Sequence, residues 1–439
     1  MGFKEYKGLD LVGTGKEILE RWKRNNAFRR SLEVREGAPE FIFFEGPPSA
    51  NGMPGIHHVL ARSIKDSICR YKTQSGYRVD RRAGWDTHGL PVELGVEKML
   101  GITKEDIGTK ISVEDYNNAC RKEVMKYTRE WVNLTERIGY WVDMNDPYVT
   151  YDNRYIETLW YLLKDIYGKG LLYKGYSIQP YSPAAGTGLS SHELNQPGCY
   201  RDVKDTTAVV QFEVVKNDAS SALYEGCGAP VYFLAWTTTP WTLPSNTALC
   251  VGPSIDYVRV ASFNPYTGAP AVYVVAEVLL HEHFSPKAAD IPLEDYRPGD
   301  KLVPYKVLDG KFKGSELAGI SYRQLIPWFN PGEGAFRVIP GDYVTTDAGT
   351  TGIVHIAPTF GADDDRVAKA SGVPPLMVID KNGDRQAQVD RKGRFYRIED
   401  MDPAYVAANV SDDYREVAGR YVKNAYDSSL PPDAPTLDV

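Results

Sequence analysis

The stretch FIFFEGPPSANGMPGIHH, residues 41–58, decides the fold of this chain. Its first four residues form a short apolar run, typical of a strand that is buried on both faces. The turn that follows is rich in Gly and Pro, so a ligand can approach the backbone there. Apolar residues then recur at helical spacing, at Leu60, Ile64, Ile68 and Tyr71, and Gly76 marks the expected end of the helix. Such a strand, loop and helix unit predicts a nucleotide site, because a helix N-terminus attracts phosphate. An ordinary loop with two surface histidines is the alternative.

The same alternation of helix and strand extends over the first 185 residues. A polar, basic helix is expected over 16–35, a second strand over 77–81, and a helix that opens at Pro91. A capping signal at Ser112 predicts one long helix to about Ile138. A further helix carries an apolar face made of Ile156, Leu159, Trp160, Leu163 and Ile166. Alternation of this kind predicts a parallel α/β sheet, with ligands at the carboxyl ends of its strands.

From about residue 200 the sequence changes to short β-rich segments separated by turn residues. Strands are expected over 209–215, 231–236, 257–262, 271–276, 336–339, 353–356 and 376–379. This pattern favours a barrel-like β domain with one or two small helices. The predicted domains are therefore 1–185 (first half of an α/β domain), 186–200 (connector), 201–400 (mostly β) and 401–439 (return segment or linker).

Length and composition limit the class of protein. A chain of 439 residues predicts two or three domains, and 51 Lys and Arg against 58 Asp and Glu give a net charge of −7. This acidic balance argues against nonspecific coating of nucleic acid. No apolar run is long enough for a membrane span, and no secretion signal is seen. Because the 5 cysteines are scattered without a Cys-x-x-Cys pair, we expect neither disulfides nor zinc, and a cytoplasmic location.

Several sequence islands occur in an order that resembles a known family. Besides 45–58 they are GWDTHGLPVE (84–93), YWVD (140–143), WTTTPWTLPSN (236–246) and GIVHIAP (352–358). Together they resemble class I aminoacyl-tRNA synthetases, and among these the isoleucyl enzymes. The third threonine of the threonine-rich island is the most specific feature, since valyl and leucyl enzymes have Arg at that position. The resemblance implies the first half of a Rossmann-like catalytic domain, followed by an inserted β-barrel-like editing domain.

The resemblance also implies roles for residues near the first island. Pro47, by its carbonyl, and Asp86, by its carboxylate, would receive the ammonium group of isoleucine. His58 would stabilise the triphosphate of ATP, which carries Mg²⁺, while the amino acid carboxylate attacks the α-phosphorus. For Asp86 a helix N-cap is the alternative. The implied partners are tRNA(Ile), isoleucine and ATP, with no membrane, and the expected state is a monomer.

The first island departs from the family's His-x-Gly-His signature at two positions. Gly55 stands where the first histidine belongs, and His57 stands where the glycine belongs. We count Gly55, His57 and His58 as ATP-binding and the two histidines as catalytic. Whether His57 takes over the missing role or only fills space is left open.

The editing role implied for the β domain is hydrolysis of valine attached to the isoleucine tRNA. The residues that the resemblance assigns to it are Trp236, Thr237, Thr238, Thr239, Thr242, Asn246, His355 and Asp364. The threonines supply hydroxyls, His355 a polar wall, and Asp364 the anion for the substrate ammonium group. The alternatives are a strand edge for the threonines, a buried and satisfied histidine, and a solvated helix start for 363–365.

Three function classes remain open at this point. The first is the N-terminal part of an isoleucine ligase with an editing site; this part alone is expected to be inactive in aminoacylation, because the resemblance places the second half of the nucleotide fold beyond Val439. The second is a freestanding trans-editing hydrolase, which would need no nucleotide loop. The third is a noncatalytic RNA-binding paralogue, which the retained Asp86, His355 and Asp364 disfavour.

Overall fold

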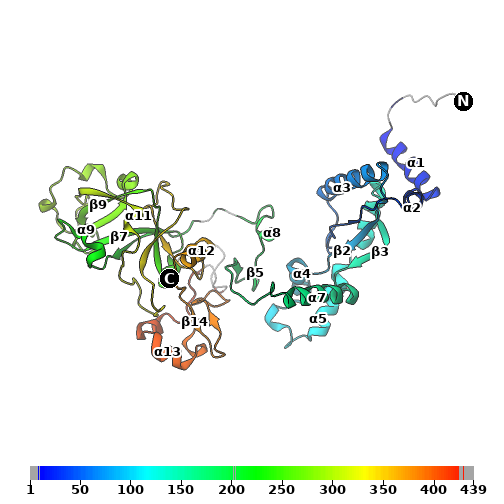
Figure 1. The fold of residues 1–439 in the computed structure, drawn as a ribbon. Coiled ribbons are helices and arrows are strands. Elements are labelled where there is room, and N and C mark those ends of the chain that lie inside the picture. The colour runs from blue at the N-terminus through cyan, green and yellow to red at the C-terminus, as the bar shows by residue number, and fades with distance from the viewer. Residues whose placement is uncertain (1–7, 9, 201, 203, 425–428, 430–439) are drawn as a thin grey trace. The chain divides into compact units, whose positions relative to one another are not determined.

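A computed structural model describes residues 8, 10–200, 202, 204–424 and 429. The chain forms two compact units, residues 1–175 and 176–439, and we describe each by itself (Figure 1). The stretch 428–439, which we expect to be a linker, lies outside the described residues except for residue 429.

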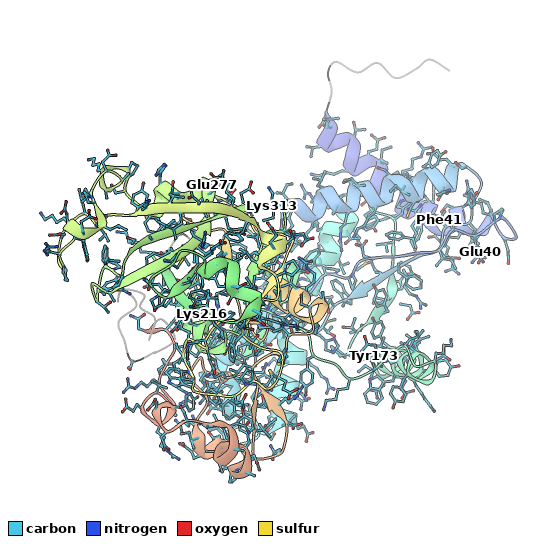
Figure 2. All side chains as sticks on the ribbon, turned by 60° about the vertical axis from the view of Figure 1, so that its left-hand side comes forward. Glu40, Phe41, Tyr173, Lys216, Glu277 and Lys313 are labelled. Carbon is cyan, nitrogen blue, oxygen red and sulfur yellow. The ribbon has the colours of Figure 1, made fainter. Side chains whose placement is uncertain are left out.

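The first unit is built on a parallel sheet. Within its described residues the sheet has three strands in the order β1 (Phe43–Phe44), β2 (Arg81–Trp85) and β3 (Asp143–Val149). The prediction of parallel strands is confirmed. Pairing between the segments before β1 and β2 begins earlier, with a parallel bridge between Glu40 and Arg78 and a hydrogen bond from Phe41 N to Arg78 O at 2.8 Å. Figure 2 labels Glu40 and Phe41 on this segment.

Seven helices occupy the described part of this unit: α1 (Leu11–Arg24), α2 (Ala27–Glu33), α3 (Ile56–Gln74), α4 (Leu90–Leu100), α5 (Val113–Val124), α6 (Thr128–Arg137) and α7 (Asn153–Gly168). Two predicted helices were too long. The one expected over 16–35 is broken where Asn26 adopts a left-handed φ of 47°, which ends a right-handed helix. The one that begins after Ser112 is capped as predicted, by a hydrogen bond from Asp115 N, but it stops at Val124.

The prediction that β1 is buried on both faces was wrong in this structure. Ile42 and Phe44 are 61% and 58% exposed. The apolar stripe of α3 is also exposed, since Leu60, Ile64, Ile68 and Tyr71 each have more than half of their surface accessible. Apolar periodicity identifies one face of an element, but it does not show whether this part of the chain covers that face.

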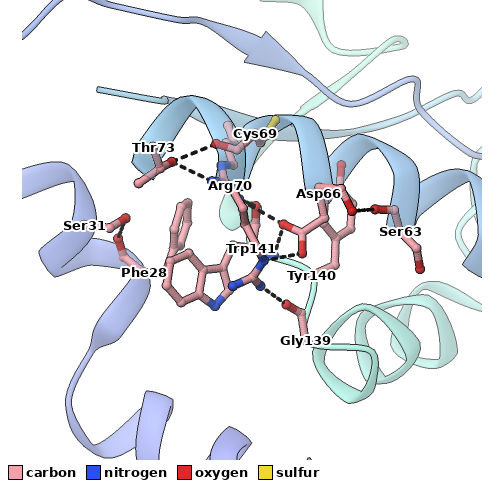
Figure 3. Close-up of polar contacts among 12 residues, drawn as sticks. Phe28, Ser31, Ser63, Asp66, Cys69, Arg70, Thr73, Gly139, Tyr140 and Trp141 are labelled. Carbon is pink, nitrogen blue, oxygen red and sulfur yellow. Dashed lines mark hydrogen bonds and ion pairs between the residues drawn. The ribbon is translucent and has the colours of Figure 1, made fainter. Parts of the chain in front are cut away.

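The buried face of α3 is polar instead. Asp66 binds Arg70 Nε at 2.6 Å and Arg81 Nη1, on β2, at 3.0 Å (Figure 3). Arg81 also donates to Thr73 Oγ1 at 2.9 Å, and the Arg70 guanidinium lies 4.3 Å from the ring centroid of Trp141. Because both arginines have a carboxylate and further acceptors, burial leaves few unpaired groups in the cluster. This network attaches α3 to the sheet and so fixes the start of the helix next to the glycine-rich loop.

The second unit contains a mixed, curled sheet. Eight of its described strands form this sheet: β6 (Ala208–Glu213), β7 (Val231–Thr237), β8 (Ala248–Val251), β9 (Asp256–Phe263), β10 (Pro270–Ala276), β11 (Lys306–Lys313), β12 (Arg337–Pro340) and β13 (Ile353–Ile356). The path is β11-β9-β10-β7-β13-β8-β12, and β6 pairs with β7. The predicted β-rich second half is confirmed, although β8 and β11 were not anticipated. Strand β7 is interior, so the threonine-rich island does not follow an edge strand.

Smaller elements complete the unit: β4 (Tyr181–Ser182), β5 (Thr187–Gly188), α8 (Ser191–Leu194), α9 (Ser221–Tyr224), α10 (Leu280–His283), α11 (Gly314–Leu317), α12 (Ala362–Ala370), β14 (Val378–Ile379), β15 (Arg385–Gln386) and α13 (Pro403–Asn409). Met401, Tyr414 and Val422, from the segment expected to return or link, are buried in a core cluster of this unit. The largest core cluster lies under β6–β10 and includes Phe212, Phe233 and Tyr322.

Candidate functional site

A cavity of about 390 Å³ lies between the glycine-rich loop, α3 and α6. Its walls include the loop backbone at 46–49 and side chains from the first turns of α3. Because α3 begins at Ile56, directly after the loop, its free backbone N–H groups lie close to the loop. Strand end, loop and helix start thus meet at one place, as the sequence predicts.

A buried carboxylate forms the floor of this cavity. Glu45 ends the β1 segment, is 3% exposed, and accepts hydrogen bonds from Lys65 Nζ and Tyr140 OH. Burial and this hydrogen bond raise the pKa of Tyr140 well above its ordinary value. Arg62, also in the wall, donates to Thr135 Oγ1 at 2.5 Å. Sequence reasoning missed Glu45, Arg62 and Lys65 as site residues, although 58, 62 and 65 share one helical face.

His58 faces the cavity and is held by the loop. Its Nδ1 accepts from Gly55 N at 2.9 Å, and its ring packs edge-on against Trp131 at 4.6 Å between centroids. Burial, followed by the neighbouring His57, lowers the pKa of His58. Trp131 Nε1 in turn donates to Gly52 O at 2.9 Å. These contacts fix the loop conformation around the imidazole.

His57 occupies the space that a side chain at position 55 would use. A Cβ built on Gly55 would lie 2.8 Å from His57 Cε1, and the His57 and His58 rings lie 3.8 Å apart. The His57 side chain is exposed and is not among the residues that line the cavity. Its imidazole therefore lies over Gly55, and the two departures from the signature are physically coupled.

The structure brings Pro47 and Asp86 to the same edge of the sheet. Pro47 lines the cavity, and the adjacent Pro48 carbonyl accepts from Asp86 N at 3.1 Å. Asp86 is not the cap of α4, since Gly89 holds that position and Asp86 Oδ1 receives only a long bond, 3.4 Å, from His88 N. Its carboxylate is partly exposed and not among the lining groups of the cavity.

A second cavity, of about 300 Å³, lies at the end of β7 in the second unit. All but one of the residues that the resemblance assigns to editing line this cavity: Trp236, Thr237, Thr238, Thr239, Thr242, His355 and Asp364. Trp241 and Phe360, which the sequence did not indicate, also line it, with ring centroids 4.9 Å apart. The short helix Pro240–Ser245 turns the island back so that its hydroxyls converge.

Hydroxyl groups in this cavity form a chain that reaches His355. Thr237 Oγ1 accepts from Thr239 N at 3.1 Å, and Thr239 Oγ1 lies 3.3 Å from Thr242 Oγ1. Thr242 Oγ1 lies 2.8 Å from His355 Nε2. Asn246, the remaining assigned residue, lies behind the wall with Nδ2 3.2 Å from His355 Nδ1. His355 is thus both a buried, satisfied histidine and part of the cavity wall.

Asp364 is the acidic group of the cavity. It lies in the first turn of α12, and its Oδ2 accepts from Ala357 N at 2.9 Å. Burial is the main cause that raises the pKa of Asp364, and the backbone bond opposes it. Asp363 and Asp365 instead pair with Arg366 and Lys369 outside the cavity. One carboxylate of the three therefore faces the threonines.

Two potential metal ligands that lie close together in the sequence, Glu193 and Cys199, have other contacts. Glu193 accepts from Ser190 N at 2.6 Å and caps α8, and Cys199 Sγ donates to Leu194 O at 2.7 Å. Across the residues that the structure describes, no group of three or more His, Cys, Asp or Glu side chains has the geometry to hold a metal ion. In the same residues, no helix has the length and hydropathy that a bilayer crossing requires.

Comparison with known proteins shows the family to which this α/β and β-rich chain belongs. The family model of class I tRNA synthetases (I, L, M and V) matches residues 17–404, so the chain belongs to this family. Within the family, the isoleucine–tRNA ligase of Bacteroides fragilis is 65% identical over 438 residues, which are 100% of this chain and 38% of that protein. The isoleucine–tRNA ligase of Porphyromonas gingivalis is 64% identical over 440 residues, again 100% and 38%.

The chain thus spans 38% of the length of these relatives. Among solved structures, the editing domain of a P. knowlesi cytosolic leucyl-tRNA synthetase covers 38% of this chain and 64% of its own. That likeness has 15% sequence identity and a TM-score of 0.28.

Proposed function

We propose that this chain is the part of an isoleucine–tRNA ligase that holds the first half of the activation site and a hydrolytic editing site. The observation that carries the proposal is the second cavity, where the threonine island, His355 and Asp364 converge. We further propose tRNA(Ile), isoleucine and ATP as partners of the whole enzyme, a monomeric state, and a cytoplasmic location.

In the activation site, the chain's own groups would bind and orient the reactants. The carbonyl of Pro47 and the carboxylate of Asp86, at one sheet edge, would receive the ammonium group of isoleucine. His58, with a lowered pKa, would donate to the triphosphate from its free Nε2 while Nδ1 stays bonded to Gly55. ATP brings Mg²⁺ with it, and catalysis of this step consists of positioning and charge stabilisation.

The editing site would compensate for the limited selectivity of the activation site against valine. Valine lacks one methylene of isoleucine, which discriminates by only about 1 to 3 kcal/mol; the handling of valine by isoleucyl enzymes is the standard example. A cavity of about 300 Å³ that is lined by threonine residues and one carboxylate residue, Asp364, suits a small amino acid ester. The hydroxyls would hold the attacking water and Asp364 the ammonium group.

His355 would act as a wall rather than as a proton acceptor. Both of its ring nitrogens have polar neighbours, and burial lowers its pKa to about 4. It therefore stays neutral at physiological pH and narrows the cavity next to Thr242. A larger side chain such as that of isoleucine would meet this wall first, which would protect the correct product.

The two other function classes are less well supported. A freestanding hydrolase would not need the cavity floored by Glu45 or the match of residues 17–404 to the ligase family. A noncatalytic RNA-binding paralogue would not need Asp364 in the second cavity, where burial raises the pKa of its carboxyl group, since burying a carboxylate is unfavourable for folding.

The test is deacylation of purified valyl-tRNA(Ile) and isoleucyl-tRNA(Ile) by the 439-residue chain. We expect valyl-tRNA(Ile) to be hydrolysed faster than the spontaneous background, and isoleucyl-tRNA(Ile) to be spared. In the same preparation, ATP–pyrophosphate exchange with isoleucine should stay at background, because the chain spans 38% of its relatives. Equal, background hydrolysis of both esters would refute the editing assignment.

A further inference from the structure

The surroundings of His355 decide which of its ring nitrogens carries the proton. A neutral imidazole has one N–H donor and one acceptor nitrogen. Nε2 lies 2.8 Å from Thr242 Oγ1, a hydroxyl that can donate or accept. Nδ1 lies 3.2 Å from Asn246 Nδ2, an amide nitrogen that can only donate. The orientation of the Asn246 amide therefore selects the tautomer.

Three partners fix the orientation of that amide. Its nitrogen lies 2.8 Å from the carbonyl oxygen of Ala248 and 3.4 Å from that of Ile356, and both oxygens can only accept. Its oxygen lies 2.6 Å from Tyr322 OH. A flipped amide would place its oxygen against two carbonyls and leave the Tyr322 proton without an acceptor, so the network assigns Nδ2 to the His355 side.

The direction of the hydrogen bonds in the cavity then follows. With Nδ1 as acceptor, His355 carries its proton on Nε2 and donates to Thr242 Oγ1. The Thr242 hydroxyl donates in turn to Thr239 O at 2.8 Å. Thr239 Oγ1, 3.3 Å from Thr242 Oγ1, is left to donate towards it and to turn its lone pairs to the cavity. These lone pairs can accept a proton of a water molecule and so orient the water oxygen towards an ester carbonyl.

We propose that Tyr322 and Asn246 are positioning residues that hold His355 as its Nε2–H tautomer and thereby orient the hydroxyls of the threonine island. This inference rests on the proposed editing function. It makes His355 a fixed donor, and it extends the site to a core tyrosine that lines neither cavity.

Tyr322 can be tested by a single substitution, because only its hydroxyl group takes part in the hydrogen bonds that reach Asn246 and His355. The side chain is 2% exposed, and its ring packs edge-on against Phe212 and Phe336 at 5.3 and 6.0 Å. Tyr322→Phe keeps these ring contacts but leaves the amide oxygen of Asn246 buried without a donor. The amide is then oriented by its nitrogen contacts alone, so its hold on His355 Nδ1 should weaken.

A matched control is available in the same core. Tyr257 is also fully buried, and its hydroxyl donates to Gly352 O at 2.6 Å without touching the His355 network. Tyr257→Phe removes a buried hydroxyl of similar surroundings. It should lower stability in a similar way while leaving the tautomer and the hydrolysis rate as in the wild type.

The experiment combines two readouts on the 439-residue chain. In ¹⁵N-histidine-labelled protein, the ring nitrogens of His355, identified among the 7 histidines by their loss in His355→Gln, report the tautomer. Hydrolysis of valyl-tRNA(Ile) reports its consequence. We expect only Nε2–H in the wild type and Tyr257→Phe, and a mixture in Tyr322→Phe with hydrolysis slower by roughly five- to fiftyfold. Asn246→Asp, which places a carboxylate against Nδ1, should invert the tautomer.

The two proposals fail in different ways. No valyl-tRNA(Ile) hydrolysis by the wild type refutes the editing function whatever the spectra show. Hydrolysis with His355 protonated at Nδ1 in the wild type refutes the positioning role alone. So does a Tyr322→Phe variant with pure Nε2–H and a wild-type rate.

Discussion

Replacing Asp364 by asparagine removes the negative charge of the second cavity while keeping the size and shape of the side chain. The carboxylate accepts a backbone hydrogen bond from Ala357 N at 2.9 Å, which ties α12 to the end of β13. An asparagine oxygen can keep this bond, whereas alanine would lose it together with the charge. Asp364→Asn therefore tests the anion itself.

The expected loss follows from the contact that disappears. A charge-assisted hydrogen bond between a carboxylate and the substrate ammonium group contributes about 1.5 to 3 kcal/mol, or about ten- to a hundredfold in rate at subsaturating substrate. The assay is the initial rate of valyl-tRNA(Ile) hydrolysis by wild type and Asp364→Asn. As the proposed anchor, the carboxylate would contact the substrate in the ground state as well as in the transition state, so the loss should appear mainly in KM.

The thermal stability of Asp364→Asn, unlike its hydrolysis rate, should not fall below that of the wild type at neutral pH. Burial raises the pKa of Asp364, so the folded state favours the protonated acid. The stabilising contribution of such a group is present below the unfolded pKa, about 3.9, and is lost as pH rises through the folded pKa. At neutral pH the wild type therefore carries a buried charge that Asp364→Asn removes. The Tm of the variant should equal or exceed that of the wild type at pH 7, and the difference should shrink in acid.

Neighbouring aspartates supply the controls. Asp363→Asn and Asp365→Asn each remove one negative charge from the same helix start, but both side chains pair with exposed cations outside the cavity. Both variants should hydrolyse valyl-tRNA(Ile) at wild-type rates. If Asp364→Asn also retains the wild-type rate, or if all three variants lose activity equally, the assignment of Asp364 as the ammonium anchor is wrong.

Three further predictions follow from the two cavities. His355→Ala should enlarge the second cavity and let isoleucyl-tRNA(Ile) be cleaved while valyl-tRNA(Ile) hydrolysis continues; a strong loss of valyl-tRNA(Ile) hydrolysis without relaxed specificity would favour a direct catalytic role. Burial lowers the pKa of His355 from 6.5 to about 4, so the neutral ring stabilises the fold above pH 6.5. About 3 kcal/mol of this contribution should be lost as the pH falls to 4. The free energy of unfolding of His355→Gln, measured by chemical denaturation, should therefore depend less on pH over this range than that of the wild type. Since His57 fills the space above Gly55, Gly55→Ala should destabilise the chain in the wild type but less in a His57→Gly background, with a coupling of about 0.5 to 3 kcal/mol in a double-mutant cycle; additive effects would show that the two positions are independent.

The sequence alone determined the features that depend on local pattern. Gly and Pro between an apolar run and a helical repeat specified the loop at 45–58, and short apolar runs separated by turn residues specified the β-rich second half. These signals are local because turn chemistry and strand periodicity act over a few residues. The cap at Ser112 was predictable for the same reason.

Only the tertiary structure decided which faces are buried and which groups meet. The apolar stripe of α3 is exposed, while Asp66 and Arg81 pair under the helix from positions 15 residues apart. Glu45 meets Tyr140 across 95 residues, and Asn246 meets Tyr322 across 76. No local pattern encodes such pairs, because a buried polar group is satisfied by whichever partner the folded chain brings to it. The residues that line the second cavity were therefore assigned from the family resemblance of the sequence, whereas the hydrogen-bond partners behind them are set by the fold.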